Sequence, residues 1–367
     1  MIKPKGGRRL TRKNKSIKGR AKAKGGKYIY AGSYGCVFSP AILCKGETTR
    51  KNGYISKIME PEAAYDEQKE ATILKRLDGA YEYFLYPDRI CEPIADKSNG
   101  PENCKLKFSK TPVALMSPFG GVDLRKIQVP FQEIPALFEG MVNLFDGLEL
   151  LHANNLIHND LKPHNIVALK GDDGSYKVRL IDFGLMKTVD NYLKEDSFHN
   201  YPYYPYDVRL LSENYFPKNE DIEEFYLEQE YNQFPMWFYA REDGKQLITK
   251  KWVMSMWKKM KTVEAQRRVV LELDVFSLGR TLYELYFRLT GHFYVMGDDE
   301  GEVMGQDHAG IKKDVSLPLF KLVQKMCNPD PFERITLKEA KAEFVALLPA
   351  IKKAIMPVPV AAKGLSV

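Results

Sequence analysis

Cysteine is scarce in this 367-residue sequence, and the few cysteines are widely spaced. They are odd in number, scattered along the chain, and contain no C-x-x-C pair. This pattern argues against a disulfide framework and against a zinc site, so it favours a reducing compartment. The five cysteines are Cys36, Cys44, Cys91, Cys104 and Cys327.

Long apolar runs are also absent. No stretch approaches the length of a membrane-spanning helix, and the basic N-terminus has neither an apolar core nor a cleavage site behind it. The sequence therefore predicts neither an integral membrane protein nor a secreted one. We expect an intracellular protein.

Acidic residues are missing from residues 1–27, which contain twelve lysines and arginines. The formal net charge of the chain is +7, so the remainder carries −5, the difference between +7 and +12. Such a Gly-, Lys- and Arg-rich segment buries too little apolar surface to offset its ordering entropy. We predict a disordered tail, which either binds nucleic acid or another anionic surface or serves solubility or nuclear targeting.

The rest of the composition is that of a folded protein. Hydrophobic residues make up 44% of the chain and charged residues 28%, near the averages of globular proteins. A chain of 367 residues can form about two domains, or one two-lobed unit with its own cores.

The expected secondary structure changes along the chain. Strands are predicted on both sides of a glycine turn in residues 28–38, at 54–59, and at 112–119 with a break at Pro118. Helices are predicted at 62–77, 134–151 and 271–289. The sequence thus predicts an α+β fold with a small β-rich N-terminal lobe, a short hinge and a larger, mainly helical C-terminal lobe.

The most specific motif is HNDLKPHNIV at residues 158–167, followed by the strand VRLIDFG that ends at Asp182, Phe183 and Gly184. This pair of motifs resembles the protein kinase family. Phosphoryl transfer needs a carboxylate near the attacking hydroxyl, a positive charge near the γ-phosphate, and oxygen ligands for Mg²⁺. The resemblance implies that Asp160 orients the hydroxyl and Lys162 steadies the phosphate. It also implies that Asn165 and Asp182 hold magnesium.

A glycine turn at residues 30–37 resembles the family's phosphate-binding loop, with Tyr30 in place of the first glycine. The resemblance places Gly32, Ser33 and Gly35 near the nucleotide phosphates. It also implies that Lys57 contacts phosphates and pairs with a helix glutamate. Glu70 is the preferred partner, because the apolar residues that follow it match the family, and Glu67 is the second candidate.

The resemblance also implies a pocket for the ATP base. Val37 and Ile55 would cover the base and Val167 would form its floor. Leu115 or Met116 would lie at the back, with the backbone near Met116–Ser117 reading the base edge. Asp123 would bind the ribose, or it is a solvated loop acid.

Three further positions bear on the resemblance. Asn159 stands where the family usually has an arginine that pairs with a loop phosphate, so phosphate-driven ordering is not expected. Asp207 is predicted to pair with Arg334 in a buried ion pair. Asp274 is predicted to anchor the loop that carries Asp160.

The resemblance covers about residues 28–350, interrupted by a long insertion. The insertion contains an acidic stretch at 220–230 and a predicted helix through Trp252, Met256, Met260 and Val263. The two segments are either a solvated acidic helix and a packing helix, or a docking surface for a basic partner.

The predicted boundaries are 1–27 for the tail, 28–116 for the N-lobe, 117–121 for the hinge, 122–350 for the C-lobe with the insertion at about 208–270, and 351–367 for a C-terminal tail.

These features predict a protein serine/threonine kinase that uses ATP and Mg²⁺ on a protein substrate. The Lys162-Pro163 sequence favours serine/threonine specificity. The alternative is a pseudokinase or scaffold that binds nucleotide or partners without turnover. The chain is similar to kinases of large cytoplasmic DNA viruses in the stretches CVFSP and YISKI, in Asn159 and in the insertion. This similarity implies a location in the cytoplasm or nucleus of a host cell, or in the virion.

Overall fold

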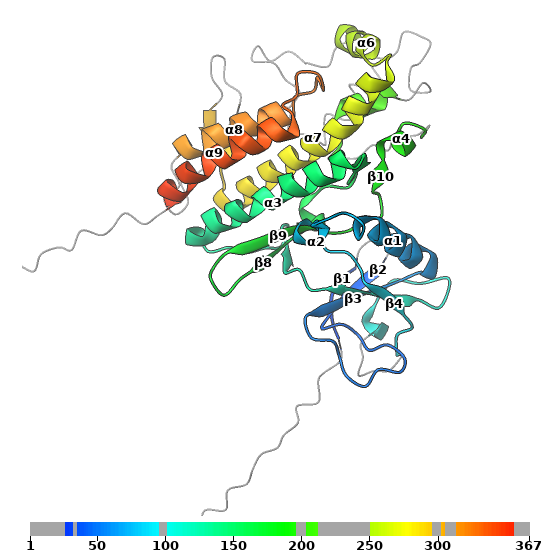
Figure 1. Ribbon diagram of the computed structural model, residues 1–367. Coiled ribbons are helices and arrows are strands. Elements are labelled where there is room, and N and C mark those ends of the chain that lie inside the picture. Colours follow the sequence, from blue (N-terminus) through cyan, green and yellow to red (C-terminus); the bar gives the residue numbers. More distant parts are fainter. Residues whose placement is uncertain are drawn as a thin grey trace, which may run out of the picture.

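A computed structural model of the chain is shown in Figure 1. It describes residues 26–31, 35–94, 101–195, 203–211, 250–295, 302–304 and 313–355. The predicted tail, apart from its last two residues, lies outside the described residues, as do Gly32, Ser33, the acidic stretch of the insertion and residues 356–367.

An antiparallel five-stranded sheet forms the N-terminal part, in the order β1-β2-β3-β5-β4. The strands are β1 (Lys27–Ala31), β2 (Gly35–Ser39), β3 (Tyr54–Met59), β4 (Arg89–Cys91) and β5 (Val113–Pro118). The prediction of strands at 28–38 and 54–59 is confirmed, and β5 ends at Pro118, where the strand was expected to break.

The register of this sheet separates its two faces. Val37, Lys57 and Leu115 lie opposite one another across β2, β3 and β5, so they share one face. Helix α1 (Pro61–Leu74) lies on that face, where Ala64 packs with Leu115 in a small buried cluster. The helix therefore covers the face of the sheet that carries Lys57. Figure 1 shows α1 beside this sheet.

The opposite face of the sheet carries two disulfides, so the prediction of no disulfide framework was wrong. Cys36 is bonded to Cys104 and Cys44 to Cys91, with Cα atoms 5.6 and 5.8 Å apart. The partners are 68 and 47 residues apart in sequence. Cys36 lies in β2 and Cys91 in β4, and each is bonded to a cysteine of a connecting segment. The argument from cysteine spacing for a reducing compartment therefore loses its support.

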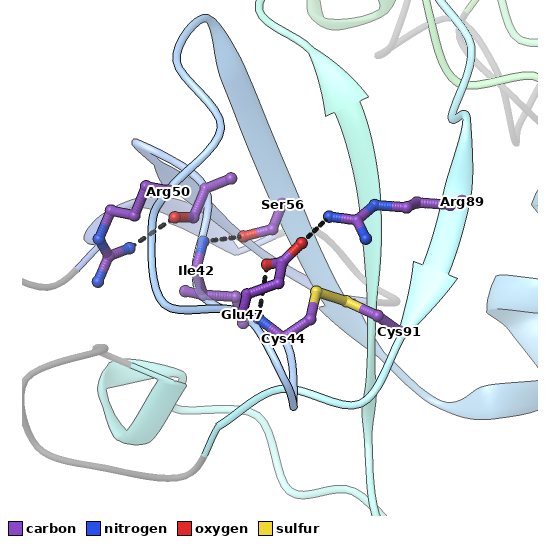
Figure 2. The surroundings of a disulfide bond; sticks show 8 residues. Ile42, Cys44, Glu47, Arg50, Ser56, Arg89 and Cys91 are labelled. Atoms are coloured by element: carbon purple, nitrogen blue, oxygen red, sulfur yellow. Dashed lines mark hydrogen bonds and ion pairs between the residues drawn. A yellow bond between two sulfur atoms is a disulfide. The ribbon is translucent and has the colours of Figure 1, made fainter.

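Polar contacts surround the Cys44–Cys91 disulfide (Figure 2). Glu47 accepts the amide N–H of Cys44 at 3.0 Å and pairs with Arg89 of β4. Ser56 Oγ accepts the amide N–H of Ile42 at 3.0 Å. These contacts hold the segment between β2 and β3 against the sheet.

Helices dominate the C-terminal part, as predicted. They are α2 (Ala80–Tyr83), α3 (Ile134–Ala153), α4 (Val189–Tyr192), α6 (Lys250–Lys259), α7 (Val263–Thr290), α8 (Lys313–Met326) and α9 (Leu337–Ile355). Among these helices, α3 and α7 carry more buried residues than the others, and α9 packs along α3 (Figure 1). Among the described residues, no helix has the length and apolar character needed to cross a membrane.

Short strands form three further small sheets after β5. They are β6 (Val122–Asp123), β7 (Leu156–Ile157), β8 (Ile166–Lys170), β9 (Tyr176–Leu180), β10 (Lys187–Thr188), β11 (Phe293–Val295) and β12 (Glu302–Met304). Strands β6, β8 and β9 form one sheet, and β9 packs on α3. The contact is close because a Cβ on Gly140 of α3 would lie 2.2 Å from the carbonyl oxygen of Tyr176.

Two helix predictions need correction. The helix expected through Trp252, Met256, Met260 and Val263 is two helices: α6 ends at Lys259, and α7 begins at Val263 after Thr262 caps its N-terminus. Val263 is therefore exposed rather than packed with Met256 and Met260. Helix α9 continues to Ile355, past the expected end of the C-lobe at residue 350.

Candidate active site

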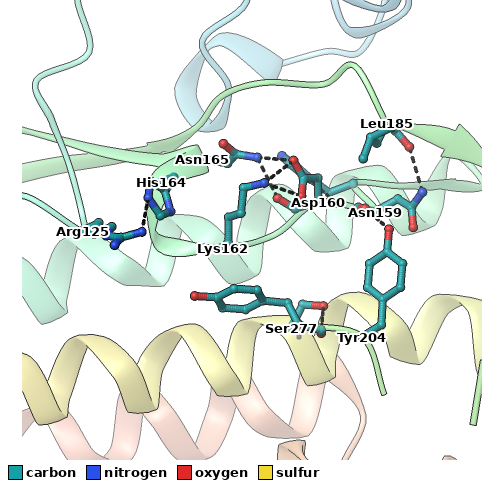
Figure 3. A network of polar contacts seen from close by, with 11 residues as sticks. Arg125, Asn159, Asp160, Lys162, His164, Asn165, Leu185, Tyr204 and Ser277 are labelled. Atoms are coloured by element: carbon teal, nitrogen blue, oxygen red, sulfur yellow. Dashed lines mark hydrogen bonds and ion pairs between the residues drawn. The ribbon is translucent and has the colours of Figure 1, made fainter. Parts of the chain in front are cut away.

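The loop at residues 158–165, called here the Asp160 loop, carries a network of three polar side chains (Figure 3). Lys162 Nζ donates to both carboxylate oxygens of Asp160, at 2.8 and 2.9 Å. Asn165 Nδ2 donates to Asp160 Oδ2 at 2.7 Å and to the Asp160 carbonyl at 2.9 Å. Asp160 and Asn165 are buried, so these contacts hold both side chains in one orientation.

Asp182 lies directly beside this network. The amide N–H of Ile181 donates to the carbonyl of Asn165 at 2.9 Å, which joins the end of β9 to the Asp160 loop. Asp182 is exposed and has a φ of 63°, a left-handed conformation that is uncommon outside glycine. The next residue, Phe183, is buried between the rings of Phe84 and His158. Burial of Phe183 thus holds Asp182 turned outward.

Asp274 of α7 anchors the Asp160 loop from below, as expected. Its carboxylate accepts the amide N–H groups of His158 at 2.9 Å and Asn159 at 3.1 Å. It also contacts the ring of His152 at 3.2 Å. Asn159 has a φ of 59°, and the two amide hydrogen bonds offset the strain of that backbone conformation.

Lys57 pairs with Glu67 of α1, not with Glu70, so the preference for Glu70 was wrong. Burial would lower the pKa of Lys57, but the carboxylates of Asp182 and Glu67 outweigh it and raise that pKa. Lys57 is therefore charged and lies within the field of Asp182. Glu70 lies on the same helix, where burial raises its pKa and the charges of Lys69 and Asp66 act on it.

The sheet register corrects the placement of Met116. Met116 pairs with Ser56 on the face opposite to Lys57, where it is 1% exposed and packs with Cys36 and Phe38. Leu115 lies across from Lys57 and Ser117 across from Ile55. A shift of one residue along a strand reverses the face of a side chain, and the sequence did not specify this register.

Gly120 is a site residue that the sequence reasoning missed. A Cβ at this position would lie 2.6 Å from Val167 and 2.1 Å from Leu85, so only glycine fits. Val167 pairs with Asp123 across β6 and β8. The backbone of Gly120 therefore borders the expected floor of the base pocket. The signal was present in the sequence as the Gly120–Gly121 pair within the predicted hinge at 117–121.

Asp123 lies at the entrance of this region and is half-buried. Its carboxylate accepts the amide N–H of Lys126 at 3.1 Å and lies 3.3 Å from Lys126 Nζ. The Lys126 ammonium also lies 4.3 Å from the centre of the Tyr30 ring on β1. Tyr30, which replaces a glycine of the family pattern, thus contacts the segment after β6.

The segment after Asp182 is held by contacts that need no phosphate. Asn159 Nδ2 donates to the carbonyl of Leu185 at 3.1 Å (Figure 3). Strand β10 pairs with β7, and Lys187 forms an ion pair with Glu195. Tyr204 donates its hydroxyl to the carbonyl of Asn159 at 2.6 Å. Asn159 therefore joins both ends of this segment to the Asp160 loop.

The expected pair of Asp207 and Arg334 is present and fully buried. Arg334 Nη2 donates to Asp207 Oδ1 at 2.8 Å, and both side chains are 0% exposed. Arg334 also donates to the carbonyl of Glu272 at 3.1 Å. This pair ties the 3-10 turn at Tyr206–Leu211 to α7.

The donors near Asp182 fit a magnesium ion shared with phosphates. No cluster of three or more His, Cys, Asp or Glu side chains suited to a metal occurs within the described part of the chain. Mg²⁺ commonly binds one or two protein carboxylates and completes its coordination with phosphates and water. The exposed carboxylate of Asp182 and the amide oxygen of Asn165, whose nitrogen is turned to Asp160, provide such oxygen ligands.

Comparisons with known proteins point to one family. Residues 123–222 match the family model of the protein kinase domain. The chain is 28% identical to cyclin-dependent kinase 4 of Xenopus laevis over 165 residues, 43% of this chain and 47% of that protein. It is 27% identical to mitogen-activated protein kinase kinase kinase 3 of Arabidopsis thaliana over 201 residues, 54% of this chain and 30% of that protein.

A shorter stretch of the chain has a higher sequence identity to another protein. The chain is 43% identical to the probable serine/threonine-protein kinase ireA of Dictyostelium discoideum over 51 residues, 14% of this chain and 5% of that protein. The chain spans less than half of the length of these curated relatives. Together the matches support the protein kinase family for this chain. The resemblance to viral kinases stays a prediction.

Proposed function

We propose that this chain is a two-lobed protein serine/threonine kinase that transfers the γ-phosphoryl group of ATP to a protein hydroxyl with Mg²⁺. The observation that carries the proposal is the placement of Asp160, Lys162 and Asn165 beside Asp182, with Lys57 in the field of Asp182. The matches to serine/threonine kinases support the same class of enzyme.

Each side chain of the site has a role in this reaction. Asp160 orients the acceptor hydroxyl and accepts its proton as the oxygen bonds to the γ-phosphorus and the bond to the ADP oxygen breaks. In the structure, the Lys162 ammonium forms an ion pair with the Asp160 carboxylate. In the reaction, Lys162 would contact the phosphoryl group as it is transferred. Lys57 would bind the nucleotide phosphates. Asp182 and Asn165 would hold Mg²⁺, which neutralises charge on those phosphates when bound.

The test is phosphorylation of an acidic and a basic generic protein by the purified chain with Mg·ATP. We expect Asp182→Asn to abolish transfer, because its carboxylate is the main charge available to the metal. Asp160→Asn should lower the rate by roughly 10²–10⁴-fold, the usual range for a positioned base. Asp172→Asn, a change of an exposed acid in the turn between β8 and β9, serves as the matched control and should leave the rate unchanged.

Two outcomes would contradict the proposal. Equal rates for Asp160→Asn, Asp182→Asn and the parent chain would show that these residues do not form the active site. Nucleotide binding without any transfer would instead support the pseudokinase alternative.

The basic segment 1–27 is proposed to bind nucleic acid or another anionic surface. Support comes from its twelve positive charges without a single acid. Binding through phosphate contacts should weaken steeply as salt is raised. Retention of the chain on DNA or RNA, compared with a variant lacking residues 1–25, tests this proposal.

A further inference from the structure

Beside the Asp160 loop, two side chains form a contact that the phosphoryl-transfer chemistry does not use. Arg125 follows β6, and its Nη1 lies 2.7 Å from Nε2 of His164. His164 belongs to the Asp160 loop, between Pro163 and Asn165. In Figure 3, Arg125 and His164 lie on one side of Lys162, and Asp160 lies on the other side of Lys162.

The contact fixes the protonation of His164. A guanidinium has only donors, so His164 Nε2 must accept and the ring must be neutral, with its proton on Nδ1. Nδ1 is buried without a hydrogen-bond partner within the described structure. The pair therefore carries one full positive charge, on Arg125.

That charge has no counterion in the described part of the chain. Arg125 is exposed, and no carboxylate within the described ranges lies at ion-pair distance from it. The two carboxylates whose charges act on the His164 ring are both engaged with residues other than Arg125. Asp123 is bound to Lys126, and Glu284 accepts the hydroxyl of Tyr203.

The backbone that carries Arg125 is built into the fold. Arg288 of α7 donates to the carbonyl of Ile127 at 2.8 Å and to that of Leu124. The amide N–H of Leu124 donates to the carbonyl of Ile166 at 2.8 Å. Residues on both sides of Arg125 are thus fixed to α7 and to β8, so its guanidinium is presented at a defined position beside the Asp160 loop.

We propose that Arg125, oriented by His164, binds an anionic side chain of the protein substrate near the acceptor hydroxyl. The substrate class is therefore an acidic segment around the acceptor serine or threonine. This inference rests on the proposed kinase function and deepens it. Arg125 is the specificity-determining residue, and His164 is a positioning residue. The anionic group is either the carboxylate of Asp or Glu or the phosphate of a residue that is already phosphorylated, since a guanidinium binds both through paired N–H donors.

The test compares serine peptides that are identical except for their flanking residues. One peptide carries Asp and Glu, a second carries Lys and Arg, and a third carries phosphoserine in place of one acidic residue. We expect the full chain to prefer the acidic peptide by about tenfold or more in kcat/KM, the scale of a charge-assisted contact. Arg125→Gln should remove that preference. Arg76→Gln, a change of an exposed arginine two residues after the end of α1, should retain it.

The third peptide identifies the source of the anion. A phosphoserine peptide that exceeds the carboxylate peptide, with the advantage lost in Arg125→Gln, would assign the site to previously phosphorylated substrates. Equal or poorer use would assign it to Asp and Glu. A preference for the basic peptide, or a ratio that Arg125→Gln leaves unchanged, would overturn the proposal.

His164 has a test of its own. His164→Ala should raise KM for the acidic peptide severalfold with little change in kcat, because only the orientation of Arg125 is lost. His164→Gln offers a side-chain acceptor and should restore part of the effect. An equal loss with the acidic and basic peptides would indicate a merely structural role for His164.

Peptide binding separates this inference from the proposed function. Fluorescence anisotropy with a non-hydrolysable ATP analogue measures affinity without transfer. Binding of the acidic peptide that depends on Arg125 but leads to no phosphorylation would contradict the kinase function and keep the site. Transfer that depends on Asp160 but shows no acidic preference would contradict the site and keep the function.

Discussion

At the residue scale, Glu67 and Glu70 provide a direct comparison on one helix. Glu67 pairs with Lys57 within the field of Asp182, whereas Glu70 has no contact with Lys57. We predict that Glu67→Gln lowers kcat/KM for ATP by about tenfold or more, equivalent to about 1.4 kcal/mol, because Lys57 loses the partner that orients it. Glu70→Gln is the matched control and should change kcat/KM by less than about twofold.

Steady-state kinetics with Mg·ATP measure both variants. A larger effect of Glu70→Gln than of Glu67→Gln would show that the Lys57–Glu67 pair is not the one used in turnover. Thermal melts of both variants separate a change of the site from a loss of the fold.

Glu272 of α7 is a second residue with a measurable consequence. Burial raises its pKa from 4.5 to about 7, although Arg334 and Arg268 oppose the shift. The folded state therefore holds this proton more tightly than the unfolded state, so the free energy of unfolding falls as the pH rises from about 4.5 to about 7.

We predict that Glu272→Gln stabilises the protein at pH 8 and has little effect near pH 5. Glutamine keeps the volume and removes the charge, so the gain is at most about 3 kcal/mol for a shift of this size. Thermal melts across this pH range measure it, with Glu333→Gln as the exposed control. Parallel pH profiles for Glu272→Gln and the parent chain would contradict the assignment.

At the scale of elements, the segment that begins at Asp182 is fixed through Asn159. Its side-chain amide reaches the carbonyl of Leu185, and its own carbonyl accepts the Tyr204 hydroxyl. Four hydroxyl side chains of this segment could accept a phosphate. Thr188 caps α4 and Tyr192 is 2% exposed, whereas Ser197 and Tyr201 lie outside the described residues. The contacts that hold the described part of this segment thus involve no phosphate.

We predict that phosphatase treatment changes the rate by less than about twofold. Asn159→Ala should lower the rate more than phosphatase does, because it removes the hydrogen bond to Leu185. Asn154→Ala removes a comparable bond to the carbonyl of Leu150 at the end of α3 and is the matched control. A large loss on dephosphorylation would show that a cation elsewhere pairs with a loop phosphate.

At the scale of the whole molecule, the two disulfides hold the sheet and its connecting segments together. They close loops between residues 68 and 47 positions apart. Each disulfide is expected to stabilise the folded chain by about 2–4 kcal/mol. Cys327, buried beneath α7, is the free cysteine among the five.

We predict that reductant lowers the melting temperature of the chain by several degrees, because the unfolded chain gains freedom. A variant with Ser at positions 36, 44, 91 and 104 should melt at the same temperature with and without reductant. Thiol labelling of the unfolded, unreduced chain, followed by mass spectrometry, should find one free thiol. Five free thiols before reduction would contradict the disulfide assignment.

The sequence by itself determined the parts of the site that are close in the chain. Asp160, Lys162 and Asn165 lie within six consecutive residues, so a single loop places them together. Asp182 follows a strand that pairs with the strand after that loop, and short hairpin pairing is readable from alternating apolar residues. Helix α3 was predictable from its apolar periodicity, and residues 271–289 of α7 from their apolar character, for the same local reason. The start of α7 at Val263 was not predicted.

Only the tertiary structure decided the features that depend on register, rotation or long-range pairing. Glu67 and Glu70 are about 60° apart around α1, and the docking of the helix on the sheet selects the one that faces Lys57. The pairing of β3 with β5 turns Met116 into the core and leaves Leu115 on the Lys57 face. The disulfide partners, 68 and 47 residues apart in sequence, also meet only in the folded chain. Local pattern sets which elements form, but contacts between elements are set by the packing free energy of the whole chain.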